Sequence, residues 1–243
     1  MIAIATYKFS QLFVSLFLEV FSLPSSNRSS PASDELPAEL ADELAPWRSL
    51  VSRALHRNRA QAFCRFLQLA TVRADGTPAN RTIVFRGFLA GSNQLMFISD
   101  RRSEKISQLQ QNPIAEACWY FTKTREQLRL SGHLTVVSAD TAETSSADPQ
   151  ISVLAQSRQQ LWERISDNAR LQLAWPHPKE RRIETADFNP PAPDPQVPPS
   201  TFCLLLLNPH SVDWLSLRGE PQDRKLYVRD DGSDNWQITE VNP

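Results

Sequence analysis

Three basic residues and a serine could together bind an anion: one basic residue lies on an expected strand, and the other three residues lie at the start of an expected helix further along the chain. Arg81 begins an expected strand at 81–86, and Arg102, Ser103 and Lys105 lie at the start of a short expected helix. The first N–H groups of a helix have no partner inside it, and the helix dipole makes that end positive, so anions bind there. Ser103 is typical of a helix N-cap, and the basic side chains can donate charged hydrogen bonds. The pattern predicts a phosphorylated ligand, although an ordinary capped surface helix with solvated charges would look the same.

The elements expected around this cluster are short strands with a few helices. Apolar residues alternate or form short runs in the strands, and they recur at helical spacing in the helices. Asp75-Gly76 is a hairpin signal between the first two strands. The expected strands are 66–72, 81–86, 95–99, 115–121, 127–137, 202–207, 225–229 and 236–241, and the expected helices are 42–59, 106–111 and 152–175. Such a series suits a mainly β fold with flanking helices, closed into a small barrel, better than a doubly wound sheet.

The length suits one domain with an N-terminal extension. For 243 residues, one domain of about 190 residues plus a tail is the natural size. The apolar run at 12–18 is too short to span a bilayer, and a Ser/Pro-rich spacer follows at 25–34, so residues 1–34 are expected to form a poorly ordered extension. A weak targeting segment or an upstream start-site artefact are the alternatives. The domain then covers 35–243, and a proline-rich connection at 189–199 precedes its last strands.

Composition argues against several classes of protein. The 26 basic and 27 acidic residues nearly balance, and no basic face with interleaved aromatics is visible, so a nucleic-acid partner is not expected. Cys64, Cys118 and Cys203 are scattered through apolar runs, which suits buried reduced thiols in a cytoplasmic protein. No spacing of cysteines and histidines indicates a metal site. Neither a glycine-rich dinucleotide fingerprint nor a serine-nucleophile motif is present, and no membrane association is expected.

Longer stretches resemble a known family, the pyridoxamine 5′-phosphate oxidases and their flavin-binding relatives, which share a split β-barrel. In that family an Arg-x-Val-Leu-Leu-Lys strand is followed by Phe-Tyr-Thr-Asn, Ser-Arg-Lys, Asn-Pro and Arg-Gln-Val. The counterparts here are Arg81 to Arg86, Phe97-Ile98-Ser99-Asp100, Ser103-Glu104-Lys105, Asn112-Pro113 and Glu126-Gln127-Leu128. A second match near the C-terminus aligns the family's Glu-Phe-Trp, Asp-Arg and Asp-x-Trp-x-Ile with Val212-Asp213-Trp214, Asp223-Arg224 and Asp234-Asn235-Trp236-Gln237-Ile238. Two separated matches in the same order make the resemblance specific.

The resemblance implies an FMN-binding split β-barrel that works as a homodimer with FMN at the subunit interface. It gives Arg81 and Lys105 to the FMN phosphate, with Ser99 and Ser103 as hydroxyl partners. It also implies that a tryptophan and an arginine reach the flavin from the second subunit. The full set of cofactor-binding residues expected on this basis is Arg81, Ile83, Val84, Arg86, Ile98, Ser99, Arg102, Ser103, Lys105, Gln127, Trp214 and Arg224.

The chain departs from the family's cofactor pattern at two positions. The family's strand lysine becomes Arg86, which keeps the charge but replaces a compact ammonium by a planar fork. The arginine of Ser-Arg-Lys becomes Glu104, a reversal of charge beside the expected phosphate, and Arg102 is the residue nearest in sequence that can replace the lost cation. Taken singly, Trp214 would suit a core aromatic and Arg224 a solvated charge; the ordered match favours the cofactor roles.

The substrate half of the family pattern is largely lost. The family grips a substrate phosphate with a Tyr, an Arg and a Ser on one helix, whereas the aligned positions here are Trp162, Ser166 and Arg170. An Arg-x-His pair near the C-terminus falls on Glu220 and Gln222. The expected function is therefore an FMN-dependent oxidoreductase in which a small, unidentified substrate gives a hydride to the flavin, with no catalytic side chain assigned. A non-catalytic flavin- or haem-binding barrel, and a true pyridoxamine/pyridoxine 5′-phosphate oxidase, are the alternatives.

Overall fold

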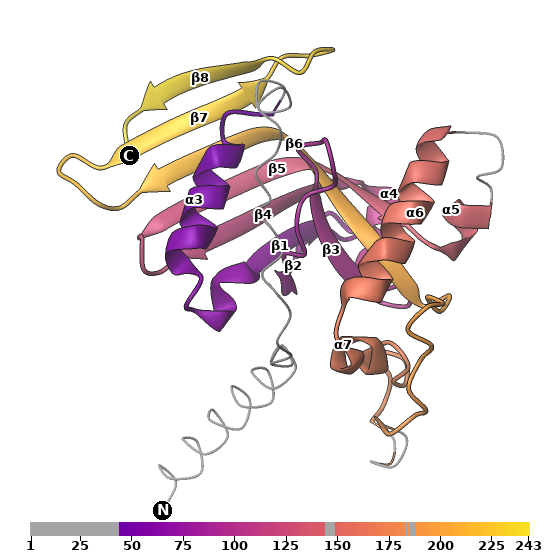
Figure 1. Cartoon of the computed structure of the whole chain (residues 1–243). Helices are drawn as coiled ribbons and strands as arrows, with labels where there is room; N and C mark the ends of the chain where they lie inside the picture. The colour runs from indigo at the N-terminus through magenta and orange to yellow at the C-terminus, as the bar shows by residue number, and fades with distance from the viewer. Residues whose placement is uncertain (1–43, 144–148, 183, 185–187) are drawn as a thin grey trace, which may run out of the picture.

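The computed structural model describes residues 44–143, 149–182, 184 and 188–243. The extension expected at 1–34 and the first residues of the helix expected at 42–59 lie outside the described residues. Within the described part, the mainly β fold with flanking helices is confirmed (Figure 1).

Eight antiparallel strands make the sheet: β1 Phe66–Val72, β2 Pro78–Val84, β3 Leu95–Asp100, β4 Ile114–Phe121, β5 Glu126–Val137, β6 Phe202–Ser216, β7 Asp223–Arg229 and β8 Trp236–Val241. Their order in the sheet is β2-β1-β4-β5-β6-β7-β8. The remaining strand, β3, pairs with the first half of β6, on the edge of β6 opposite to β5. Just beyond β2, the N–H of Arg86 donates to the carbonyl of Met96 at 2.9 Å, and the N–H of Met96 donates to the carbonyl of Gly87 at 2.8 Å. These bonds close β1, β2, β3, β6, β5 and β4 into a barrel, and β7 and β8 extend the sheet past it.

The barrel interior is filled by every second residue of its strands. Side chains alternate between the two faces of a strand, so β1 buries Leu67 and Leu69 and β4 buries Trp119 and Phe121 in one core. The helix α3, Arg48–Asn58, packs Val51 against the same core. This is the helix expected at 42–59, with its boundary inside the expected range.

A second core lies on the outer side of β6. The helices α6, Pro149–Arg164, and α7, Asp167–Gln172, pack with the start of β6 around Phe202, Leu204 and Leu206. Leu205 and Leu207 point into the barrel instead, so the first half of β6 is buried on both faces and reads as an unbroken apolar run. Figure 1 shows α5 (Ala139–Glu143), α6 and α7 on one side of the barrel and the β7–β8 pair extending from the other.

The structure refines three expectations. The helical segment at 152–175 is two helices, because Ser166 leaves the helical conformation and accepts a hydrogen bond from the N–H of Ala169 as the cap of α7. The strand expected at 202–207 continues to Ser216. Cys64 lies in a short 3-10 helix (Ala62–Arg65), not in a strand, and Cys118 is only half-buried; all three cysteines are free.

Candidate functional site

Lys105 forms the centre of the expected phosphate site. It lies in the first turn of the helix α4, Glu104–Gln111, and its Nζ donates to Ser99 Oγ at 2.9 Å and to Ser103 Oγ at 2.8 Å. Burial, with a smaller contribution from the positive charge of Arg81, lowers the pKa of Lys105 to about 8. None of the ion pairs among the described residues includes Lys105. The cluster is therefore a partly desolvated ammonium with two hydroxyls and no carboxylate in contact.

Arg81 reaches the same region from β2. Its Nη1 donates to Thr71 Oγ1 at 2.6 Å and its Nη2 donates to Gln108 Oε1 at 3.0 Å, so the side chain lies across β1 and against α4. Burial lowers the pKa of Arg81, and Arg73 lowers it too, while Glu104 acts in the opposite direction. Thr71 and Gln108 were not expected from the sequence. Gln108 follows Lys105 by three positions, so the helical spacing of α4 was the signal that could have found it.

Ser103 occupies the N-cap position of α4, as expected, but its hydroxyl does not cap the helix. The hydroxyl donates to the carbonyl of Asp100 at 2.7 Å and accepts from Lys105. The start of α4 thus carries no side-chain cap. Two cations, two hydroxyls and an uncapped helix N-terminus are the donor set that a phosphate needs, so the residues present fit the phosphate group of FMN.

Arg102 belongs to a different network. Its Nε and Nη2 bind the carboxylate of Asp100 at 3.0 and 2.6 Å, and Nη2 also donates to the carbonyl of Trp175 at 2.9 Å. Its charge is therefore matched by Asp100, and its role is to hold the chain after α7 against the turn before α4. The expectation that Arg102 replaces the cation lost at Glu104 gains no support from this arrangement.

Glu104 instead pairs with a residue that sequence reasoning did not consider. Its carboxylate accepts a charged hydrogen bond from Lys179, and both side chains are exposed. The hydrogen bond from Lys179 lowers the pKa of Glu104, with smaller contributions from Arg73 and Arg81. The reversed charge is thus offset at the protein surface by Lys179.

The other cofactor residues expected in this part of the chain lie on β2 and β3 or just past the end of β2. Arg86 lies two residues past the end of β2, and burial lowers its pKa to about 10. The side chain of Ile83 is buried in the barrel core, so only its backbone is left to face a cofactor. Val84 and Ile98 are half-buried on β2 and β3, and Ile98 packs against the second core.

The other expected cofactor residues lie on β5, β6 and β7. Gln127 and Arg224 are both paired with Leu215, so the two side chains lie on one face of the sheet. Trp214, the neighbour of Leu215, points to the opposite face, is 8% exposed and packs in the barrel core, where its Nε1 donates to Glu126 Oε1 at 3.3 Å. Its role as a flavin contact stays a prediction. In the described chain, no hydrogen bond or ion pair joins these residues to Arg81 or Lys105.

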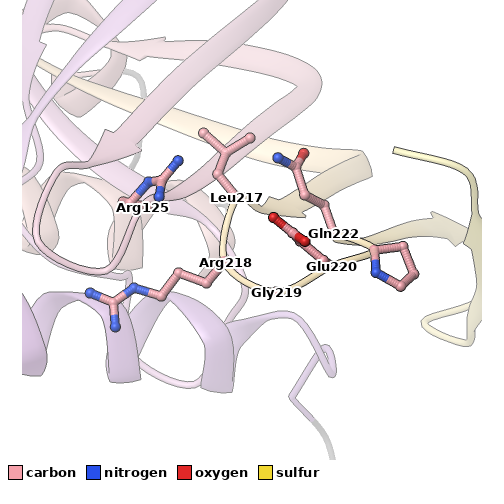
Figure 2. A pocket seen from close by; sticks show the side chains of 7 residues that line it. Arg125, Leu217, Arg218, Gly219, Glu220 and Gln222 are labelled. Carbon is pink, nitrogen blue, oxygen red and sulfur yellow. The ribbon is translucent and has the colours of Figure 1, made fainter.

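A cavity of about 500 Å³ opens between the β4–β5 turn and the β6–β7 loop. Figure 2 shows the residues that line it, which are Arg125, Leu217, Arg218, Gly219, Glu220, Pro221 and Gln222. Glu220 and Gln222 are the positions where the family pattern has Arg-x-His. Arg125 and Arg218 were not expected, because only the pairing of β5 with β6 brings the two loops together.

The helix positions that align with the family's substrate-phosphate grip pack in or beside the second core. Trp162 is fully buried and its Nε1 donates to the carbonyl of Asp194 at 2.9 Å. Arg170 is buried, its Nη1 donates to the carbonyl of Ile165 at 2.7 Å, and its guanidinium lies 5.7 Å from the centre of the Trp162 ring. With Ser166 capping α7, all three residues hold the helices together. They do not form an open anion site.

Across the described ranges, no group of three or more histidine, cysteine or acidic side chains is placed to hold a metal ion. Among the helices that the structure describes, none has the length and apolar character needed to cross a membrane.

Comparisons with known proteins agree with this fold. The model of the pyridoxamine 5′-phosphate oxidase FMN-binding domain matches residues 44–138. Over 214 residues the chain is 33% identical to pyridoxine/pyridoxamine 5′-phosphate oxidase 2 of Arabidopsis thaliana, an alignment that covers 84% of this chain and 100% of that protein. The crystal structure of a pyridoxamine 5′-phosphate oxidase-related, FMN binding protein from Nostoc punctiforme gives a TM-score of 0.75 at 51% identity, covering 82% of this chain and 98% of that one. PhzG from Burkholderia lata, solved with tetrahydrophenazine-1-carboxylic acid, gives a TM-score of 0.64 at 19% identity over 86% of this chain and 98% of its own, a likeness of fold alone.

Proposed function

The chain belongs to the pyridoxamine 5′-phosphate oxidase family of FMN-binding proteins, and from this premise we propose that it is an FMN-dependent oxidoreductase whose substrate is not a vitamin B6 phosphate. FMN is its cofactor, since the chain carries the FMN-binding domain of the family. When bound, FMN supplies two-electron chemistry by which a small substrate or a reduced nicotinamide is oxidised and oxygen or another acceptor is reduced.

The observation that carries this proposal is the environment of Lys105. An ammonium that has given up part of its hydration to two serine hydroxyls, with no carboxylate in contact, is costly unless an anion completes the site. We assign Arg81, Lys105, Ser99 and Ser103 to the FMN phosphate. Arg102 is left out of this set because Asp100 already matches its charge.

The protein's own part is to bind and orient. Arg81 is held on two sides by Thr71 and Gln108, so it meets the phosphate with little loss of side-chain entropy. Arg86, half-buried just past the end of β2, would add a positive charge to the flavin site, where it would favour negative charge on a bound flavin. No side chain is assigned as a general base.

The proposed assembly is a homodimer in which each FMN site takes residues from both subunits. Gln127 and Arg224 have no direct contact with the phosphate cluster within the described chain, which is the arrangement expected if they serve the site of a partner. Three free thiols suit a reducing compartment, which supports a cytoplasmic location.

The test begins with the absorption spectrum of the purified protein. Flavin bands would support the proposal, whereas a haem spectrum would support a haem-binding barrel. Turnover with NADPH or a small amine then separates an oxidoreductase from a flavin carrier, because a carrier binds FMN and turns over neither. A protein that binds no flavin after reconstitution would contradict the proposal.

A further inference from the structure

We propose that Arg129 raises the reduction potential of the bound flavin, because its positive charge offsets the carboxylate of Asp213 that holds Arg224. This role rests on the proposed function, in which Gln127 and Arg224 are expected to contact the flavin. It goes further by assigning a part in the redox chemistry to a side chain that is not itself expected to touch the flavin.

Arg129 lies on the face of the sheet that carries Gln127 and Arg224. Side chains two residues apart on a strand point to the same face, so Arg129 lies beside Gln127 on β5, and Asp213 lies beside Leu215 on β6. Arg129 pairs with Asp213 across the two strands, and Leu215 pairs with both Gln127 and Arg224. Arg129 and Asp213 therefore form the cross-strand pair directly next to the two expected flavin contacts.

One carboxylate binds both arginines. Arg224 Nε donates to Asp213 Oδ1 at 3.0 Å and its Nη2 donates to Oδ2 at 2.7 Å, while Arg129 Nη2 donates to the same Oδ2. The side chain of Asp213 is 11% exposed, against 41% for Arg129, so the carboxylate is largely enclosed by its two partners. Among the hydrogen bonds of the described residues, none uses Nη1 of Arg224, which leaves part of this guanidinium for a ligand.

The shared carboxylate leaves a positive charge beside the expected flavin contacts. Burial would raise the pKa of Asp213, but the hydrogen bonds from Arg224 and Arg129 lower it below its usual value, so Asp213 is ionised at neutral pH. One carboxylate cannot neutralise two guanidinium groups, and one positive charge of this cluster is therefore not compensated.

The other carboxylate whose charge acts on Arg129 is farther from the expected flavin contacts. This residue, Glu116, lies on β4 and pairs with Ser131, whose hydroxyl donates to the Glu116 carboxylate at 2.6 Å. Ser131 lies two residues beyond Arg129 on β5, on the side away from Gln127. The positive charge thus lies toward Gln127 and Arg224, and Glu116 lies at the opposite end of the network.

A positive charge next to a flavin favours its reduced form. The ring system of reduced FMN is an anion near neutral pH, whereas the oxidised ring is neutral, so a nearby cation stabilises the reduced form more. Without Arg129, the charge of Arg224 would be matched by Asp213 alone, and this preference would fall. Arg129 therefore makes the bound flavin a better acceptor of electrons.

The experiment is a redox titration of the FMN-loaded protein, freed of unbound FMN and followed by flavin absorption. Arg129→Gln removes the charge but keeps a side chain that can donate to Asp213, whereas Arg129→Lys keeps the charge. We expect Arg129→Gln to lower the ratio of the affinities for reduced and oxidised FMN about fivefold, which equals a fall of about 20 mV in the two-electron potential. Arg129→Lys should keep the potential of the unmodified protein.

Arg57→Gln is the matched control, because Arg57 is an exposed arginine on α3, and it should leave the potential unchanged. An unchanged potential in Arg129→Gln would overturn the inference. A fall in Arg129→Lys as large as that in Arg129→Gln would overturn it too, since charge would then not be the cause. A loaded protein whose potential does not respond to Arg129 contradicts this inference alone, whereas an unmodified protein that binds no FMN would overturn the proposed function and this inference with it.

Discussion

Asp213 holds Arg224 through both of its carboxylate oxygens, with Arg224 Nε 3.0 Å from Oδ1 and Nη2 2.7 Å from Oδ2. The same carboxylate also pairs with Arg129 on the neighbouring strand. Burial by itself would raise the pKa of Asp213, but the hydrogen bonds from Arg224 and Arg129 outweigh it and lower the pKa. Asp213 thus fixes the orientation of the Arg224 guanidinium from the neighbouring strand.

Removing Asp213 should therefore act on flavin binding through Arg224. We expect Asp213→Ala to weaken FMN and riboflavin alike, by a factor close to that of Arg224→Ala, and the double variant to lose little more than either single one. Asp213→Asn, which keeps an acceptor oxygen, should retain most of the affinity. Fluorescence titration with both flavins measures these constants. Additive losses would show that Asp213 does not act through Arg224.

A shared site makes a prediction about mixed dimers. When a subunit with Arg81→Ala is combined with one that carries Arg224→Ala, both lesions fall on the same composite site and the other site is intact. We expect the verified heterodimer to bind about half the flavin of the unmodified protein, at unmodified affinity, whereas each variant homodimer binds weakly. A heterodimer with no recovered site would confine each site to one chain.

The phosphate assignment predicts a difference between two flavins. Arg81→Ala and Lys105→Ala should each weaken FMN binding by roughly 1.5–3 kcal/mol, because each removes a charged hydrogen bond to the phosphate. Riboflavin has no phosphate and serves as the control, so its affinity should hardly change. Equal losses for the two flavins would remove these residues from the phosphate site.

The lowered pKa of Lys105 gives FMN binding a pH dependence. Since the ammonium of the unloaded protein loses its proton as the pH rises through about 8, FMN affinity should be full below that pH and fall above it. Lys105→Arg keeps the charge and should remove this fall, and riboflavin should show none. The free energy of unfolding depends on pH in the opposite direction. Between about pH 8 and the usual pKa of 10.5, only the unfolded state keeps the Lys105 proton. The contribution of Lys105 to folding stability therefore rises with pH over this range. Calorimetric titrations with FMN from pH 6 to 10 test the binding effect.

Vitamin B6 phosphates should be poor substrates. The positions of the phosphate grip hold helices together here, and Arg-x-His is replaced by Glu220 and Gln222, so two or three charged hydrogen bonds of about 1.5–3 kcal/mol each are missing. Steady-state oxidation of pyridoxamine 5′-phosphate and pyridoxine 5′-phosphate by FMN-loaded protein measures this. A kcat/KM of about 10⁴ M⁻¹s⁻¹ or more would make the true oxidase the right function.

The strands with strong local patterns could be predicted from the sequence. β1 and β8 have the expected bounds, since period-two patterns and clear turn residues delimit them. The full length of β6 could not be predicted, because Pro209 interrupts the pattern and the strand continues past it only through pairing with β5 and β7. The site divides in the same way: Lys105 and its serines lie close together in sequence, whereas the contacts of Arg81 with Thr71 and Gln108 depend on tertiary packing.

The close approach of β5 and β6 requires a residue without a side chain at Gly132. A Cβ at this position would lie 2.1 Å from the carbonyl oxygen of Asn208, so any other residue would force β5 and β6 apart at the bulge between Ser131 and Gly132. On one side of this crossing, β6 packs against the helices; on the other, it carries Asp213 and leads into the cavity loop. Because Gly132 has no side chain, β5 and β6 can stay close together at this bulge, and β6 can serve two different surfaces: the one that α6 and α7 cover and the one that carries Asp213.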